Sequence, residues 1–285
     1  MYSAISGLKV NQTMLDTTAN NLANVNTIGY KGERTTFQDS LAEMQRGASA
    51  PGQGSGGSNA LQIGLGAQLG SIDNVMTGGA PQTTGNPLDV YIQGTGWFRV
   101  GNGTPPAVPT NFQWTRAGNF KTNPEGFVTT ADGHYVVGKG VTRGVDADGN
   151  PTYAPDNATD SYIQVPRDGT DVSVGADGSV SYVDATTGDR VVAGFIALGT
   201  FPNEAGLQRN GGSMWSTSAA SGAATVSTPG VGGTGSTVGG MLEMSNVDLA
   251  TEFTTMITAE RGFEANSRTI STADEMLQDL VNLKR

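Results

Sequence analysis

Apolar residues near both ends of the chain recur at alternating steps of three and four, which is the pattern of an amphipathic helix. Near the N-terminus, Leu8, Leu15 and Leu22 are spaced seven apart, and Ile5 begins the series. The C-terminal series is longer and comprises Leu249, Phe253, Met256, Phe263, Ile270, Leu277 and Val281. An average step of 3.5 residues is typical of a coiled-coil seam. The pattern predicts a helix within about residues 1–30 and another within 247–285.

The predicted C-terminal helix has suitable residues at both of its ends. Asn246 and Asp248 are favoured N-cap types, and Lys284 and Arg285 place positive charge where a helix dipole favours it. Neither terminal helix has an evident partner in its own stretch of sequence. We expect the helices to pack on each other, on copies of themselves, or both. The alternative is that both dock on the chain's own β core.

Between the helices, the chain shows short apolar runs of strand type interrupted by glycine-containing turns. Three stretches with a Gly-Thr-Gly or Asp-Gly turn in the middle are predicted hairpins: 87–101, 127–138 and 171–184. Residues 190–201 form a strand pair or one long strand. Strands at this spacing indicate a mainly antiparallel β domain of sandwich or barrel type, so the predicted fold class is α+β. Two Gly/Ser-rich stretches, 46–60 and 218–240, are expected to be flexible connections.

Composition restricts the chemistry that the chain can carry. The 42 glycines fit many turns, and the net charge of −10 argues against a general nucleic-acid binder. Since there is no cysteine, disulfides and thiolate metal sites are excluded. No apolar run approaches the roughly 20 residues that span a bilayer, and no Sec-type signal peptide is evident. We therefore expect neither nucleic-acid binding nor membrane insertion.

Candidate catalytic and binding motifs are weak. His134 is the sole histidine, so a His-based triad or transition-metal site is not favoured. Residues 145–156 resemble the start of a calcium loop but lack its spacing and its bidentate Glu. The G-x-G-x-x-G formed by Gly230, Gly232 and Gly235 lies in a low-complexity stretch. We expect no catalytic, cofactor or metal site, and the chain is not expected to be an enzyme.

The two termini carry longer signatures. ANNLANVNTIGYK at 19–31 and the stretch 243–285 resemble the N- and C-terminal signatures of the bacterial flagellar rod and hook axial proteins. Interior stretches 85–100, 115–138 and 178–212 resemble the β region of that family. The resemblance is weakest at 139–170, where members carry inserts of variable size. Residues 36–57 and 61–72 look most like the hook members.

The resemblance implies a structural subunit that the flagellar type III apparatus exports without a cleaved signal. It implies terminal segments that become helical when copies of the chain polymerise into a hollow tube. The expected function is that of an extracellular hook subunit, a flexible joint that transmits motor torque to the filament. The alternative is the distal rod subunit of the basal body, and a secreted β-rich binding module or enzyme is a less favoured one. Expected partners are copies of the chain, the hook cap, distal rod and hook–filament junction proteins, and the export apparatus.

With the resemblance, the expected organisation has three parts. Residues 1–30 plus 247–285 form a helical polymerisation domain, and 31–138 plus 171–246 form a β-rich core with a linker at 46–60. Residues 139–170 form a short insert in place of an outer domain. Residues expected at the subunit interface are the apolar seam positions named above together with Asn20, Asn21, Asn24, Asn26, Gly29, Tyr30, Asn266 and Arg268. We hypothesise that the asparagines end the first helix, join it to the β domain and contact neighbouring subunits.

Overall fold

The computed structural model describes residues 2–48, 50, 56–103, 105, 107–108, 111–145 and 151–283. The chain forms two compact units, each built from segments that are distant in the sequence. Unit 1 comprises residues 1–24, 32–75 and 247–285, and unit 2 comprises residues 25–31 and 76–246. Residues 32–75, which the sequence pattern assigned to the β core, are therefore grouped with the terminal helices.

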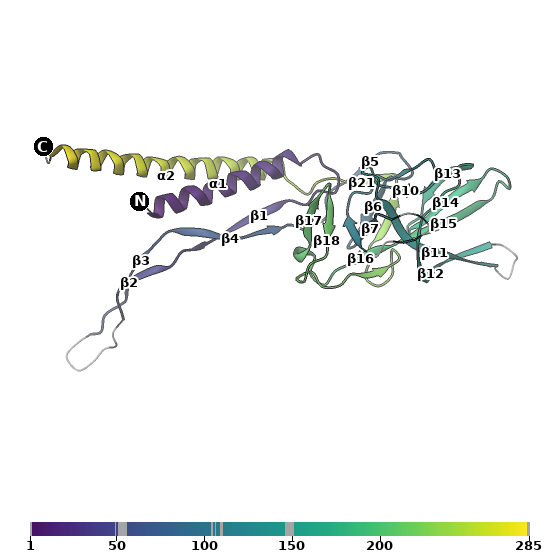
Figure 1. Cartoon of the computed structure of the whole chain (residues 1–285), viewed down its shortest axis with the longest axis horizontal. Coiled ribbons are helices and arrows are strands. Elements are labelled where there is room, and N and C mark those ends of the chain that lie inside the picture. Colours follow the sequence, from purple (N-terminus) through teal and green to yellow (C-terminus); the bar gives the residue numbers. More distant parts are fainter. Residues whose placement is uncertain are drawn as a thin grey trace. The chain divides into compact units, whose positions relative to one another are not determined.

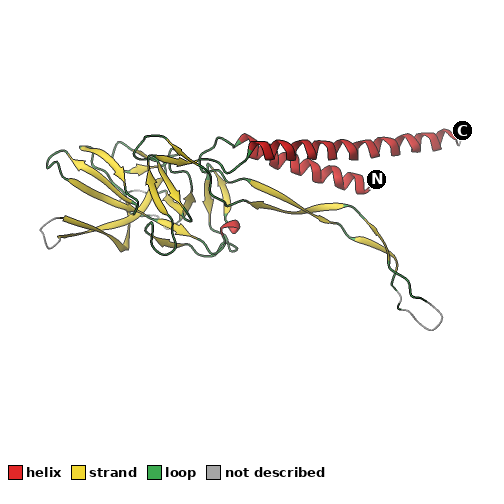
Figure 2. Cartoon of the chain, turned by 180° about the vertical axis from the view of Figure 1, so that it is seen from behind, coloured by secondary structure: helices red, strands yellow, loops and turns green. Residues whose placement is uncertain are grey.

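Unit 1 contains two helices and a ribbon of paired strands. The helices are α1 (Tyr2–Ala23) and α2 (Leu249–Leu283), and the strands are β1 (Glu33–Asp39), β2 (Ala42–Arg46), β3 (Leu61–Gly64) and β4 (Ala67–Asn74). The two helices predicted from the apolar spacing are confirmed, and they lie side by side in opposite directions (Figures 1 and 2). Asp248 caps α2, because its Oδ1 accepts a hydrogen bond of 2.9 Å from Ala250 N. Lys284 and Arg285 lie outside the described residues.

The ribbon of unit 1 is antiparallel along its whole described length. β1 pairs with β4 and β2 pairs with β3. The 46–60 stretch therefore connects two paired strands of a single ribbon and does not link domains; residues 49 and 51–55 of it lie outside the described part. Where its two strand pairs join, the ribbon contacts α1, and a Cβ at Gly66 would overlap the hydroxyl of Ser6.

Unit 2 is a β domain in which every described strand pairing is antiparallel. Its strands are β5 (Pro81–Thr83), β6 (Val90–Gln93), β7 (Trp97–Gly101), β8 (Phe112–Thr115), β9 (Lys121–Thr122), β10 (Val128–Thr129), β11 (Tyr135–Val145), β12 (Pro151–Tyr162), β13 (Gly169–Val174), β14 (Ser179–Asp184), β15 (Arg190–Ile196), β16 (Leu198–Thr200), β17 (Gln208–Gly211), β18 (Met214–Ser216), β19 (Thr225–Ser227), β20 (Ser236–Gly239) and β21 (Met241–Glu243). A short 3-10 helix spans Glu204–Gly206.

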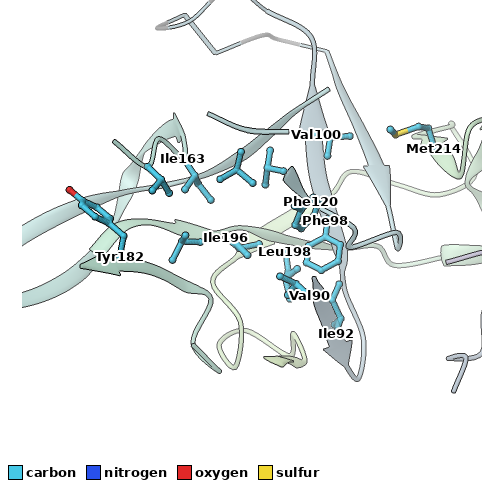
Figure 3. Packing of buried hydrophobic residues seen from close by; sticks show 14 residues of the cluster. Val90, Ile92, Phe98, Val100, Phe120, Ile163, Tyr182, Ile196, Leu198 and Met214 are labelled. Carbon is cyan, nitrogen blue, oxygen red and sulfur yellow. The ribbon is translucent and has the colours of Figure 1, made fainter. Parts of the chain in front are cut away.

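The main sheet of unit 2 has the order β13-β14-β15-β11-β7-β8-β18-β17, and two small sheets pair β20 with β6 and β21 with β5. Its largest apolar cluster gathers side chains from both kinds of sheet, including Val90 and Ile92 of β6 with Phe98 of β7 (Figure 3). A second cluster contains Trp97 and Trp215, whose rings meet edge to face at 5.6 Å. The expected fold class, a mainly antiparallel β domain with terminal helices, is confirmed.

Two of the three predicted hairpins are present. The Asp132-Gly133 turn joins β10 to β11, and the Asp177-Gly178 turn joins β13 to β14. Both glycines have positive φ, of 87° and 79°, which glycine adopts without strain. The long run at 190–201 is divided into β15 and β16, which pair with different neighbours.

The hairpin predicted at 87–101 is wrong. β6 pairs with β20, whereas β7 pairs with β8, β11 and β16 of the main sheet. Gly94 and Gly96 have φ values of 118° and 137°, and a Cβ at Gly94 would lie 3.1 Å from the Cα of Gly235. The Gly-Thr-Gly segment therefore leads the chain from one sheet into another, at a point where the backbone of Gly235 lies close to it.

The prediction of a flexible connection at 218–240 is also wrong. This stretch contains β19 and β20, and Ser221 and Thr237 are fully buried. The Thr237 hydroxyl donates a hydrogen bond of 2.7 Å to Gly175 O. Serine and threonine residues of this stretch are buried in the domain because their hydroxyls form hydrogen bonds with nearby backbone groups.

The insert at 139–170 forms no separate unit in the described residues. Most of it extends β11 and β12 as a long antiparallel hairpin, with a register shift between Lys139 and Gly140. Residues 146–150, which hold the centre of the calcium-loop-like stretch, lie outside the described part.

Candidate functional site

The described residues contain no group of three or more His, Cys, Asp or Glu side chains placed to hold a metal ion. Within the same described part, neither helix is long and apolar enough to cross a membrane. The features that stand out are the helix surfaces of unit 1 and a buried ionic cluster in unit 2.

The contact between α1 and α2 is made by small and polar residues. A Cβ at Gly7 would lie 2.7 Å from Asn266 Nδ2, and a Cβ at Gly262 would lie 2.8 Å from Asn11 Oδ1. Each asparagine also donates a hydrogen bond of 2.9 Å to the carbonyl of the glycine one turn earlier on its own helix. The two helices therefore contact through matching G-x-x-x-N segments, each asparagine covering the glycine of the other helix. The repeat of this spacing at 7–11 and 262–266 was the sequence signal for it.

The apolar seam residues are left largely uncovered by this contact. Ile5, Leu249, Phe253, Phe263, Leu277 and Val281 are exposed, and Leu8, Leu15, Leu22, Met256 and Ile270 are partly buried. Further exposed apolar residues near the end of α2 are Met276, Leu280 and Leu283. Arg268 is exposed as well, whereas Asn266 faces α1. The exposed members of the series form an apolar surface that the described part of the chain leaves open, and such a surface is suited to another protein.

The asparagine cluster ends α1, and its members have different surroundings. Asn24 lies just beyond the helix, and its Nδ2 donates a 2.9 Å hydrogen bond to Asn20 O. Asn20 and Asn26 are exposed. Asn21 is buried, 2% exposed, and its amide exchanges two hydrogen bonds with the backbone of Glu33, of 2.7 Å and 2.9 Å.

Asn21 also reaches the second helix. Its Nδ2 lies 3.1 Å from Glu252 Oε1, so one side chain connects α1, the start of β1 and the first turns of α2 within unit 1. Burial raises the pKa of Glu252 and outweighs the opposing effect of the Asn21 hydrogen bond, and nearby Asp248 adds to the rise.

Gly29 and Tyr30 lie in the interior of unit 2 and not on its surface. Gly29 has a φ of 65°, and a Cβ there would lie 2.6 Å from Ala117 N. The ring of Tyr30 is buried beneath the guanidinium of Arg209, whose Cζ is 4.6 Å from the ring centroid. Their expected contact with neighbouring subunits is thus not available from these positions, because the chain's own residues cover them.

Next to them is a buried ionic cluster that the sequence did not reveal. Lys31 Nζ lies 2.6 Å from Glu243 Oε1, and Arg116 Nη1 lies 3.2 Å from Glu243 Oε2. All three side chains are at most 3% exposed. Burial lowers the pKa of Lys31, opposed by the charge of Glu243. Lys31 and Glu243 are 212 positions apart, so no local pattern could have paired them.

Comparisons with known proteins agree along the chain. Three protein families match: "Flagella basal body rod protein" at residues 1–31, "Flagellar hook protein FlgE/F/G D1 domain" at 91–182 and "Flagellar basal body rod FlgEFG protein C-terminal" at 238–283. The flagellar basal-body rod protein FlgG of Bacillus subtilis is 44% identical over 100% of this chain and 98% of its own length. The protein of the same name from Caulobacter vibrioides is 36% identical over 100% and 98%.

More distant matches include hook proteins. The flagellar hook protein FlgE of Borreliella burgdorferi is 27% identical over 443 aligned positions, covering 100% of this chain and 99% of its own. The crystal structure of the Helicobacter pylori flagellar hook protein FlgE2 covers 66% of this chain and 47% of its own, at 13% identity and a TM-score of 0.23. The full-length identity to rod proteins and the family matches at both termini and in the β region lead to one conclusion: the chain belongs to the flagellar rod and hook protein family, whose members are structural components of the flagellum.

Proposed function

We propose that this chain is a rod subunit of the flagellar basal body, which polymerises into the shaft that carries torque outward from the motor. The observation that carries the proposal is the 44% identity to a flagellar basal-body rod protein along the whole of both chains. The hook protein match is weaker, and its 443 aligned positions exceed the 285 residues of this chain by a wide margin. Support is therefore stronger for the rod alternative than for the hook subunit expected first from the sequence.

The insert of unit 2 supports the same choice. Its described residues continue the strands of one β domain in the β11–β12 hairpin, so they add no further compact unit. The family resemblance implies that hook members usually carry a substantial outer domain in this region, whereas a short insert was expected in this chain. A subunit without that domain fits a slender shaft.

The surfaces of unit 1 are suited to polymerisation with further copies of the chain. The uncovered apolar series on α2 includes Phe253, 50% exposed, and Leu280, 63% exposed. The β2–β3 part of the ribbon is exposed at every described residue of both strands, and its Met44 and Ile63 are apolar. An isolated two-stranded ribbon is marginally stable in water, and helices with an open apolar face gain stability when a neighbour covers it.

In this proposal the partners are copies of the chain, the adjoining rod and hook proteins and the type III export apparatus, and the function is structural and not enzymatic. The test is immunogold electron microscopy of detergent-released hook–basal bodies, with an antibody raised against residues 139–170. Label on the straight segment that crosses the cell envelope supports the rod subunit. Label along the curved external segment makes it a hook subunit, and absence of label from both contradicts the axial assignment, provided that the antibody binds the native protein.

A further inference from the structure

Glu243 is the point at which three separate segments of unit 2 are held together. Its carboxylate accepts hydrogen bonds from Lys31 Nζ at 2.6 Å, from Gly79 N at 2.9 Å and from Arg116 Nη1 at 3.2 Å. Its backbone carbonyl accepts a further bond of 2.8 Å from Gly29 N. Glu243 therefore accepts four hydrogen bonds from segments that are far apart in the sequence.

The other groups of the cluster extend the same connections. Lys31 Nζ also donates to Thr77 O at 2.8 Å, and Arg116 Nη2 donates to Gly94 O at 3.0 Å. The carbonyl of Lys31 accepts a bond of 2.6 Å from Arg209 Nη2. Because the three ionic side chains are buried, these charged hydrogen bonds are shielded from water and are stronger than they would be at the surface.

The cluster lies close to the points at which the chain passes from one unit to the other. The chain passes between the two units after residues 24, 31, 75 and 246. Lys31 is the last residue of unit 2 before one passage, Thr77 is the second residue after another, and Glu243 precedes the last by three residues. The segments that leave unit 2 are thus bonded to one another immediately inside it.

We propose that the Lys31–Glu243–Arg116 cluster is an anchor that keeps force arriving through the terminal helices from peeling unit 2 apart. Both ends of the chain belong to unit 1, so a pull on the ends reaches unit 2 at residues 25 and 246. From residue 246 it meets the bonds of Asn246 to Thr77 and of Met244 N to Ala80 O, and then the bonds between Glu243 and residues 29–31. The pairing of β21 with β5 begins at Glu243 itself, which lies opposite Pro81, so this end of the pairing is loaded together with the anchor. The pairing of β20 with β6 lies further along the chain from residue 246 and is loaded later.

The inference rests on the proposed function only for the source of the force, which is the torque on an assembled shaft. Its test uses the isolated full-length chain, held by its two ends in an optical trap at constant force. Glu243→Gln leaves two buried cations with a weakened partner. The matched control is Val165→Ala, a core truncation in unit 2, and the two variants are compared under solution conditions that give unit 2 equal equilibrium stability.

At equal stability, we expect Glu243→Gln to speed the forced opening of unit 2 by roughly tenfold or more beyond Val165→Ala, because it weakens bonds near the points where the force enters, whereas Val165 lies in the core. Equal opening rates in the two variants would overturn the anchor and leave only a contribution to stability. Should Glu243→Gln fail to fold, Arg116→Lys retains the charge but loses the forked contact to Glu243 and Gly94. It should open several-fold faster than the control, and a rate equal to that of the control again overturns the proposal. Either failure leaves the rod assignment intact, because microscopy tests that separately.

Discussion

Gly7 of α1 lies against the side-chain amide of Asn266 of α2, and Gly262 of α2 lies in the same way against Asn11 of α1. This reciprocal arrangement brings the two helix backbones close together in unit 1. A glycine inside a helix normally lowers helix stability by about 1 kcal/mol relative to alanine. At both crossing points this cost is offset by the close packing of the helices that glycine permits.

A large side chain at the crossing should therefore separate the helices. We expect Gly7→Leu to destabilise the α1–α2 pair by about 1–3 kcal/mol through overpacking. Amide hydrogen exchange in residues 2–23 should become faster by roughly tenfold or more. The matched control is Lys9→Leu, which adds the same side chain at an exposed position of α1. Similar exchange in both variants would show that the glycine contact does not hold the helices together.

Asn21 is expected to be the most sensitive of the asparagines that end α1. Asn21→Ala removes both hydrogen bonds to the Glu33 backbone and the one to Glu252. We expect a loss of about 1–3 kcal/mol in the unfolding free energy of unit 1. Thermal melting followed by the helical circular dichroism signal measures it. Asn26→Ala, at an exposed position, serves as the control and should change the melting temperature little.

The pKa of Glu252 gives unit 1 a pH dependence that one variant can isolate. Because burial raises this pKa in the folded state, the folded state holds the proton more tightly than the unfolded chain does. The stabilisation from protonated Glu252 is complete below about pH 4.5, the ordinary glutamate value. It is lost as the pH rises through the raised pKa.

Glu252→Gln should remove this dependence while keeping an acceptor for Asn21. We expect the variant to be more stable than the parent chain at pH 7, with the difference shrinking toward zero at about pH 4. Chemical denaturation of both chains at a series of pH values measures the difference. A difference that stays constant with pH, or grows on acidification, contradicts a raised pKa.

The parts of the fold that the sequence predicted are those in which local spacing decides the structure. The steps of three and four residues place α1 and α2, and the Asp132-Gly133 and Asp177-Gly178 turns place two hairpins, because each signal lies within a few residues of its effect. The Gly-Thr-Gly at 94–96 carries a similar local signal. At that segment, Gly235 and Arg116 contact the chain from outside the local stretch, and β6 and β7 enter different sheets instead of pairing.

The candidate sites depended on long-range pairing that local patterns do not encode. The apolar seam suggested which faces of the helices meet, whereas the intrachain contact uses Gly7, Asn11, Gly262 and Asn266 and leaves the seam open. The ionic cluster joins Lys31 to Glu243 across 212 positions, and nothing in either stretch marks its partner. Single charged residues in a sequence are usually solvated, so a buried pair is recognised only when the fold brings both together.

The open face near the end of α2 should matter for assembly and not for the folded chain. Met276 and Leu280 are each 63% exposed, so Met276→Asp with Leu280→Asp should leave the unfolding free energy of the chain within about 0.5 kcal/mol. Two carboxylates in a buried contact between copies should prevent polymerisation, because desolvating unpaired charge is costly. The readouts are swimming of a strain lacking the native gene and the amount of chain in purified basal bodies.

A matched control separates the loss of apolar surface from the added charge. Ser271→Asp with Gln278→Asp adds the same two charges at exposed polar positions, and Gln278 projects from the side of the helix opposite to Met276 and Leu280. We expect this variant to assemble and to support swimming. Equal failure of the two variants would point to net charge as the cause. Normal assembly of both would mean that copies of the chain do not cover this face, and the contacts of the shaft would then have to lie on the ribbon or on unit 2.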